Sequence, residues 1–393
     1  MINLSVLYHI NFNHLSLSFS QRTLYIEKYL PLILNSLVIN STVSICTEDL
    51  LLLKAWNPEC FYQLINHPKI KFLLPFHTHT IPQCFPSKFL LEAKLGKQII
   101  NDLISKDKLT NIGYSSEADL FPKKILTEIT KVWDGIILGE TRIKIDNLSW
   151  EKYPPIFNIT NQQHSIKAYL SRRKFEYRDC FHQYLREDTT IDTVISAIKE
   201  NYSKFAEGKA LLARIDLEAL VLNAYTKNNK NDVSSITRWK LLQDSLIKEG
   251  INDCFLDDYF QGESNIPVLN LTKVHVGHEE DYKWSNSALQ STINKYNFSK
   301  MERKLKALLL SLYCSDYYCS RLPDLIFTHP KNKSRKITIS KDRLCRNQEF
   351  NFKLKILKRE LDYETLFLEI TNKDLLKYFY YFSKTINETA KYL

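Results

Sequence analysis

The stretch INSTVSIC (39–46), followed by EDLLLLKAWNPECFYQLI (48–65), decides the fold class of this 393-residue chain. The first segment is short and rich in β-branched residues, as buried strands are, and the second has the apolar spacing of a helix. The same strand-then-helix unit recurs over about the first 215 residues. Strands are expected at 3–9, 39–46, 70–76, 109–114, 134–138, 155–159 and 210–215, and helices at 21–37, 48–65, 87–105, 122–132, 161–172 and 191–205.

Strands that alternate with helices predict an α/β protein with a parallel sheet. The strands are continuously apolar instead of alternating, which indicates burial on both faces. Seven strands in this length favour an incomplete (β/α)7 barrel over an open nucleotide-binding sheet. No GxGxxG or Walker sequence follows a strand, which disfavours a nucleotide site.

The pattern changes after the last of these strands. Helices expected at 237–248, 284–296 and 300–322 would form a bundle packed on the barrel. Residues 336–370 alternate in places and predict a small antiparallel sheet, and 374–393 predicts a closing helix. The expected division is therefore a barrel domain at 1–235, a helical region at 236–330 and a small basic β appendage at 331–393.

Charge and cysteine usage limit the classes of partner. Of the net charge of +10, nine units lie in 331–359, so only this segment could bind nucleic acid, and we do not expect nucleic acid as a partner. The eight cysteines form no CxxC, which predicts free thiols in the cytoplasm. The N-terminus has no basic n-region and reads as a first strand instead of a signal peptide, and no apolar run is long enough to span a membrane.

Ionisable side chains stand where several predicted strands end. Strand one ends at His9, strand three runs into His77 and His79, strand four runs into Glu117, and strand seven ends at Asp216, with Glu218 two residues further. In α/β barrels the chemistry lies at these C-terminal ends. Two carboxylates on separate strands, one attacking and one donating a proton, are what retaining glycoside cleavage requires. Glu218 is placed to raise the pKa of its acidic neighbour.

Five sequence blocks resemble those of glycoside hydrolase family 57, whose catalytic domain is a (β/α)7 barrel followed by a helical region. Each block resembles one of the family's in turn: a first-strand histidine block, an aromatic-histidine block, a nucleophile block, an acid/base block and a Ser-Asp bundle block. They are LYHINFNHL (7–15), FLLPFHTHTIPQCFP (72–86), IGYSSEADLFP (112–122), LLARIDLEAL (211–220) and SLYCSDYYCSRL (311–322).

The resemblance implies a retaining glycosidase or transglycosylase on an α-linked oligo- or polysaccharide, with no metal or other cofactor. It makes Glu117 the nucleophile and Asp216 the general acid/base, and it places His9, His79 and Asp316 in contact with substrate. Glu218 and Trp284 complete the expected site.

Other interpretations of these residues stay open. Glu117 also fits a helix-start acid, Asp216 an N-cap, and Trp284 the core of a helix. A catalytically inactive carbohydrate-binding or assembly protein on the same fold is one alternative function. A metal-dependent polysaccharide deacetylase that uses His77 and His79 is another. The sequence leaves sugar identity and oligomeric state undetermined.

Overall fold

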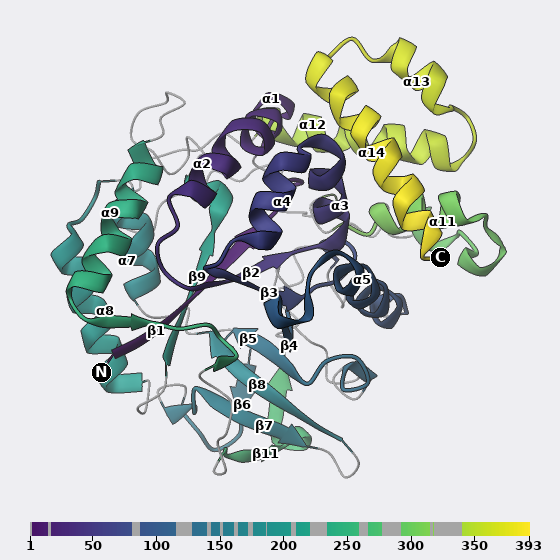
Figure 1. The fold of residues 1–393 in the computed structure, drawn as a ribbon. Coiled ribbons are helices and arrows are strands. Elements are labelled where there is room, and N and C mark those ends of the chain that lie inside the picture. Colours follow the sequence, from purple (N-terminus) through teal and green to yellow (C-terminus); the bar gives the residue numbers. More distant parts are fainter. Residues whose placement is uncertain are drawn as a thin grey trace.

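The computed structural model covers residues 1–393, and Figure 1 shows its fold. The residues that the structure describes are 2–14, 17–80, 87–114, 128–139, 143–149, 152–160, 164–171, 176–185, 187–205, 210–220, 234–258, 266–276, 292–314, 317 and 340–393.

The strands form one large, mostly parallel sheet and a separate two-stranded ribbon. The order in the large sheet is β10-β1-β2-β3-β4-β5-β8-β7-β11, and β9 pairs with the other edge of β1. Among the described pairings of this sheet, only β7 with β8 is antiparallel. The bounds are β1 Ile2–Ile10, β2 Ser41–Ile45, β3 Ile70–Leu74, β4 Leu109–Gly113, β5 Gly135–Gly139, β7 Ile156–Thr160, β8 Ser165–Ser171, β9 Ala210–Asp216, β10 Ile251–Asp253 and β11 Val268–Asn270, with the ribbon formed by β6 Ile143–Ile145 and β12 Val274–Val276.

Helices follow most of the parallel strands, and several of them begin at a side chain that caps the helix. Ser18 and the side chain of Gln21 form a capping box at α1, and Asn57 caps α4. The bounds are α1 Phe19–Leu24, α2 Leu30–Asn35, α3 Thr47–Trp56, α4 Pro58–Asn66, α5 Phe89–Leu103, α7 Glu176–Leu185, α8 Ile191–Phe205, α9 Ser234–Lys248, α11 Arg303–Ser311, α12 Ser340–Leu357, α13 Tyr363–Glu369 and α14 Lys373–Lys391, and a π-helical turn, Tyr25–Tyr29, joins α1 to α2.

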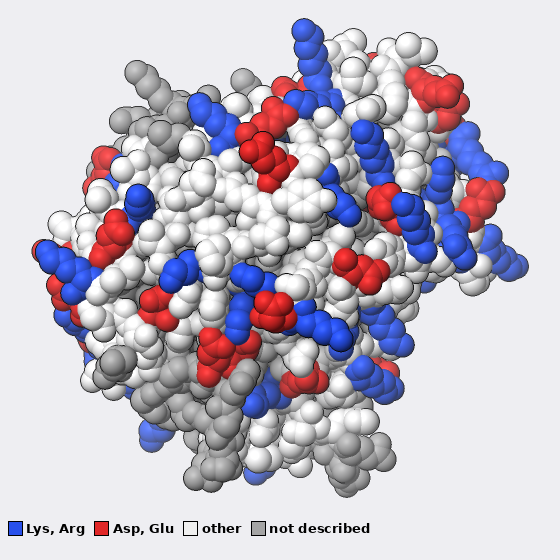
Figure 2. Space-filling view, viewed as in Figure 1, with Lys and Arg blue, Asp and Glu red and all other residues white. Residues whose placement is uncertain are grey.

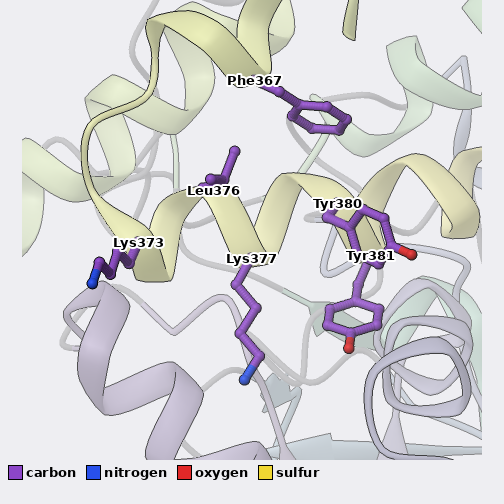
Figure 3. A pocket seen from close by; sticks show the side chains of 6 residues that line it. All are labelled: Phe367, Lys373, Leu376, Lys377, Tyr380 and Tyr381. Carbon is purple, nitrogen blue, oxygen red and sulfur yellow. The ribbon is translucent and has the colours of Figure 1, made fainter. Parts of the chain in front are cut away.

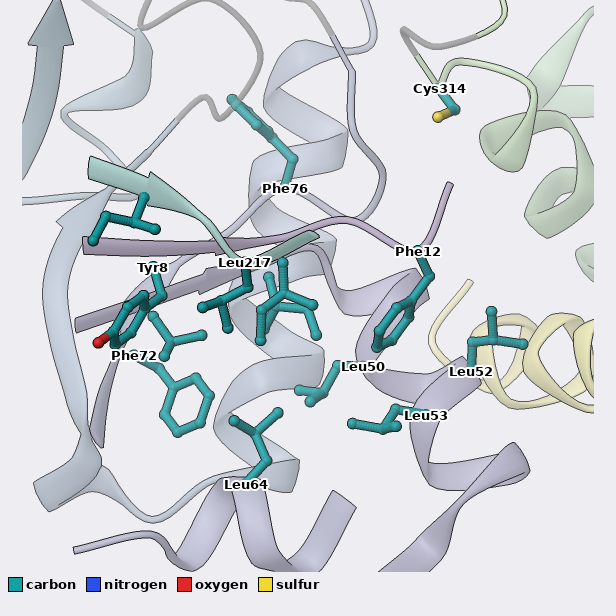
Figure 4. Packing of buried hydrophobic residues seen from close by; sticks show 14 of the residues in the cluster. Tyr8, Phe12, Leu50, Leu52, Leu53, Leu64, Phe72, Phe76, Leu217 and Cys314 are labelled. Atoms are coloured by element: carbon teal, nitrogen blue, oxygen red, sulfur yellow. The ribbon is translucent and has the colours of Figure 1, made fainter. Parts of the chain in front are cut away.

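The sheet is buried on both faces, as its continuous apolar strands predicted. On one face it packs against helices: Tyr8 and Phe72 lie with Leu50 and Leu53 of α3 (Figure 4). Neighbouring residues point the other way and meet in a second, smaller cluster, here called the inner cluster, to which seven strands of the sheet contribute. Its members are Leu7, Leu73, Ile112, Tyr114, Ile137, Ile156, Tyr169, Leu212 and Leu256.

The convergence of so many strands on one small cluster is what a barrel-like sheet requires. The parallel run reads β9-β1-β2-β3-β4-β5-β8. The described pairings do not join β8 to β9, so the fold is established as a mostly parallel α/β sheet, and the closed seven-stranded barrel stays a prediction.

The C-terminal helices pack on the helical side of the sheet, where α14 lies against α3 and α11 (Figure 1). Trp56 at the end of α3 stacks on Tyr381 of α14, with ring centroids 5.1 Å apart. Glu27, in the π-helical turn, accepts a hydrogen bond from Trp56 and pairs with Lys377 of α14. The face in Figure 2 carries basic and acidic side chains interspersed.

Two predicted elements are wrong. The small antiparallel sheet expected at 336–370 is replaced, from residue 340 onward, by the helices α12 and α13. The buried residues that the structure describes in α12 are Glu349, Phe350, Lys353, Ile356 and Leu357, and they have the three-to-four spacing of a helix. The alternating apolar residues predicted a strand. The buried face of the helix also contains charged residues, which an apolar pattern does not take into account.

The helix expected at 161–172 is instead strand β8 where the structure describes it. It forms an antiparallel pair with β7 and also a parallel pair with β5. Its buried residues Ile166, Ala168 and Leu170 alternate, which is the period of a strand. The prediction assumed that a helix follows the strand at 155–159, as helices follow the earlier strands.

The remaining expectations for the C-terminal half stand as follows. The helices expected at 237–248 and 374–393 are present as α9 and α14, and that at 300–322 is present in part as α11. The helix at 284–296 lies mostly outside the described residues, and the three-domain division stays a prediction. None of the described helices has the length and apolar character that crossing a membrane requires.

Candidate active site

The ends of β1 and β9 bring two predicted site residues side by side. In the parallel ladder between these strands, His9 pairs with Asp216. Each shares a strand face with a residue of the small inner cluster, His9 with Leu7 and Asp216 with Leu212. The inner face of the sheet therefore changes from apolar to polar toward the C-terminal ends of its strands, where active sites of α/β barrels lie.

Asp216 combines solvent access with a fixed orientation. Its side chain is 23% exposed, whereas that of Arg214, two residues earlier on the same face, is 8% exposed. Arg214 donates from Nε to Oδ1 of Asp216 over 3.1 Å, and its Nη2 lies 3.0 Å from the same oxygen. The guanidinium also lies 5.6 Å from the ring centroid of Tyr114, at the end of β4. This arrangement holds the carboxylate in place while leaving it accessible to a ligand.

His9 is a buried and neutral histidine. Burial is the largest cause that lowers its pKa well below the usual value, and the positive charge of Arg214 acts in the same direction. Its ring packs edge-on against that of His79, with centroids 5.1 Å apart. A neutral imidazole here can donate or accept a hydrogen bond without adding a charge to the strand ends.

His79 is held by Asp49, a residue of the first turn of α3. Nε2 of His79 lies 3.0 Å from Oδ2 of Asp49, and both side chains are buried. The same carboxylate accepts hydrogen bonds from the backbone N–H of Phe12 and from the side-chain amide of Asn13. Asp49 thus joins the segment after β1 to the segment after β3.

His77 does not form a common site with His79. Its Nδ1 is 2.9 Å from the hydroxyl of Thr47, and burial lowers its pKa to about 3. The two histidines therefore contact different partners, Thr47 and Asp49. The metal site expected for a deacetylase, built on both histidines, is not formed by the described residues.

The loop after β3 is anchored to the start of α3 and to α5. The first backbone N–H groups of α3 find their acceptors there: Thr47 donates to the carbonyl of Phe76 and Glu48 to that of His77. On the other side, Glu92 of α5 accepts from the backbone and hydroxyl of Thr78. These bonds fix where His79 can lie relative to α3.

Glu218 is buried, in the short helical turn Leu217–Leu220 that follows β9. One of its oxygens lies 3.9 Å from Nε2 of His14. Glu218 is therefore far more deeply buried than Asp216, which precedes it by two residues.

Three predicted site residues, Glu117, Asp316 and Trp284, lie outside the described residues. The structure describes what stands next to two of them. Tyr114 follows β4 and belongs to the inner cluster, and Cys314 forms an isolated antiparallel bridge with Thr80. That bridge brings the segment after α11 up to the His79 loop.

A pocket of about 410 Å³ lies on the C-terminal helices (Figure 3). Its lining is mostly apolar and contains none of the predicted site residues. The lining residues are Phe367, Lys373, Leu376, Lys377, Tyr380 and Tyr381.

Solved structures supply the comparison that decides the fold. The chain is similar to the 4-α-glucanotransferase of Thermococcus litoralis (11% identity, TM-score 0.56, 89% of this chain and 60% of that one). It is similar to a maltose-forming amylase of Pyrococcus sp. ST04 (11%, 0.56, 90% and 74%) and to a family 57-type branching enzyme of Pyrococcus horikoshii (10%, 0.57, 98% and 94%). The chain has the fold of glycoside hydrolase family 57 enzymes.

At these identities the likeness establishes the family 57 fold and no more. The chain spans 60% of the length of the glucanotransferase. No family model matches the sequence, and no curated protein matches it. The resemblance seen in the five sequence blocks therefore agrees with the fold, and the roles of individual residues stay proposals.

Sequence reasoning missed three residues of this region: Cys46, Asp49 and Arg214. The first two follow the C-terminal end of β2, a strand end to which the sequence prediction assigned no site residue. The rule applied to the other strand ends would have found them. Arg214 lies inside a strand, and its pairing with Asp216 follows from their two-residue spacing.

Proposed function

We propose that this chain is a carbohydrate-active enzyme, a retaining glycoside hydrolase or transglycosylase that acts on an α-linked oligo- or polysaccharide. Glu117 is the proposed nucleophile and Asp216 the proposed acid/base. The structural relatives are named as a glucanotransferase, a maltose-forming amylase and a branching enzyme, which supports carbohydrate chemistry on this fold.

The observation that carries the proposal is the position of Asp216. It is a partly exposed carboxylate at the C-terminal end of a parallel strand, next to a neutral histidine and oriented by a buried arginine. Such a carboxylate can reach a substrate that binds over the strand ends. A simple N-cap would not need the arginine on the same strand face.

In the proposed reaction, Glu117 attacks the anomeric carbon while Asp216 protonates the leaving glycosidic oxygen. Arg214 donates to Oδ1 of Asp216, which orients the carboxyl group that we propose carries the proton. Asp216 then removes a proton from water or from a sugar hydroxyl, which attacks the covalent glycosyl-enzyme and releases Glu117. Two inversions at the anomeric carbon leave its configuration unchanged.

The test is the anomeric configuration of the first product, followed by NMR with an activated α-glycoside as substrate. The proposal expects an α-product from the wild-type protein and a loss of turnover of several orders of magnitude in Glu117→Gln. Thermal unfolding of the variant should stay close to wild type, because the change preserves shape. A β-product, or unchanged turnover in Glu117→Gln, would overturn the assignment.

A further inference from the structure

Three side chains that ligate transition metals meet at the start of α3. We call Cys46, Asp49 and His79 the Cys46 cluster. One ligand atom from each, a thiol sulfur, a carboxylate oxygen and an imidazole nitrogen, lies within 4.8 Å of the other two. All three side chains are buried. The cluster does not rest on the glycosidase proposal, which assigns Cys46 and Asp49 no role; His79, which the sequence predicted to contact substrate, is buried and serves here as a ligand.

The backbone around the cluster is held in a defined geometry. Cys46 is the N-cap of α3 and Asp49 lies one turn further on, so both point from the same end of one helix. The loop that carries His79 is anchored to that same helix end by the hydrogen bonds that Thr47 and Glu48 donate to it. A metal site needs ligands whose positions are fixed in this way.

Groups around the cluster are those that support metal ligands. Asp49 receives hydrogen bonds from Phe12 and Asn13, which orient a ligating carboxylate. The backbone N–H of Asp49 lies 3.4 Å from the sulfur of Cys46 and donates to it, as N–H groups do to metal-bound sulfur.

A further ring nitrogen lies close by. His9 is 3% exposed, and its Nδ1 has no hydrogen-bond partner among the described residues. Its ring is packed against that of His79, with centroids 5.1 Å apart. His9 therefore packs against the cluster through His79, but its nitrogens are not among the ligand atoms that lie within 4.8 Å of one another, and we assign it no ligand role.

We propose that the Cys46 cluster binds a zinc ion through Cys46, Asp49 and His79. A set of one sulfur, one nitrogen and one oxygen ligand suits Zn²⁺, whereas Mg²⁺ and Ca²⁺ prefer oxygen ligands alone. Binding releases the thiol proton of Cys46 to solvent. The ring proton of His79 moves from Nε2 to Nδ1 by exchange with solvent, so that Nε2 and the carboxylate of Asp49 exchange their hydrogen bond for bonds to the metal. The ion would brace the segments after β1, β2 and β3 behind Asp216.

Equilibrium dialysis of the full chain against Zn²⁺ tests this directly, after removal of metal with a chelator. One Zn²⁺ per chain is expected, with a rise in the melting temperature on binding. Loading with Co²⁺ in place of Zn²⁺ should produce the sulfur-to-metal charge-transfer absorption of a thiolate ligand.

Two variants separate the cluster from other thiols. Cys46→Ser should abolish the cobalt charge-transfer absorption and weaken zinc binding by about 100-fold or more, since losing even an outer-shell partner costs 10–100-fold. Cys60→Ser removes another buried free thiol, on α4, and should change neither result. Failure of the wild-type chain to bind zinc stoichiometrically would overturn the proposal. Equal zinc binding by Cys46→Ser and Cys60→Ser would do so as well.

Discussion

Arg214 and Asp216 lie two residues apart on one face of β9, with Nε and Nη2 of the arginine 3.1 and 3.0 Å from Oδ1 of the aspartate. Alternate residues of a strand share a face, so the pair is placed by the strand itself. Because the arginine is nearly buried and the aspartate is partly exposed, the arginine acts as a fixed support and the aspartate as the group that meets substrate.

Replacing Arg214 tests this support. Arg214→Met should lower kcat about 100-fold, because small displacements of a catalytic group cost that much. Loss of the adjacent positive charge also favours the protonated carboxyl, so the alkaline limb of the pH–rate profile should move to higher pH. Arg214→Lys keeps the positive charge, so its kcat should lie between those of the wild type and Arg214→Met.

Arg359, which is 67% exposed and pairs with Glu302, provides the control arginine. Arg359→Met should leave both kcat and the pH profile unchanged. If Arg214→Met behaves like this control in steady-state kinetics, the arginine does not orient Asp216 for catalysis.

Glu92 should make the protein less stable as the pH rises. Burial is the main cause that raises its pKa to about 8, and the negative charge of Glu48 adds to it. Between the unfolded pKa near 4.5 and the folded value, the folded chain keeps a proton that the unfolded chain has released. The free energy of unfolding therefore falls across this pH window as the pH increases.

Glu92→Gln removes that titration and keeps an acceptor for Thr78. Compared with wild type, the variant should gain stability steadily from pH 5 to pH 8, by up to about 1 kcal/mol per pH unit. Urea unfolding at several pH values, with a chelator present, measures the difference. A difference that does not depend on pH would show that Glu92 is already ionised in the folded protein.

The ion pair between Arg22 of α1 and Glu349 of α12 should hold the C-terminal helices in place. Nη2 of Arg22 lies 2.7 Å from Oε2 of Glu349, and both side chains are buried. Lys353 is also buried, with Nζ 3.3 Å from the other carboxylate oxygen. Removing Glu349 would leave two buried cations without a counter-charge, whereas removing Arg22 would leave Glu349 still paired with Lys353.

Glu349→Gln should therefore lower the free energy of unfolding by about 3–5 kcal/mol. Lys358→Met, which removes one partner of the largely exposed pair with Glu360, should cost less than about 1 kcal/mol. Chemical denaturation of both variants measures the contrast. Similar, small effects in the two would mean that the Arg22–Glu349 pair contributes little to docking.

The fold was largely predictable because its elements repeat a local pattern. Buried parallel strands such as β2 and β3 are rich in β-branched and apolar residues, and the helix that follows β2 has a capped start. The prediction failed where local pattern is ambiguous. The strand β8 pairs with β5 and β7, partners that no local rule identifies, and α12 buries Glu349 and Lys353, which hydrophobic periodicity does not anticipate.

The candidate site was predictable at the strand ends and not beyond them. His9 and Asp216 were found because each ends a predicted strand, and the ladder places them side by side. The contact of His79 with Asp49 depends on how the loop after β3 folds against α3, which the sequence does not show. Arg214 was missed because a charged residue inside a buried strand has no motif of its own.

The most direct test of the account is the fate of Asp216→Asn with an α-glycoside that carries an activated aryl leaving group. Such a group leaves without an acid, so the first step survives, whereas the second step loses its base. We expect a rapid burst of aryl product, steady-state turnover reduced at least about 100-fold, and a glycosyl-enzyme adduct visible by intact mass spectrometry. Wild-type turnover in Asp216→Asn, or a variant that is folded and slow but forms no adduct, would contradict the assignment of Asp216 as the acid/base.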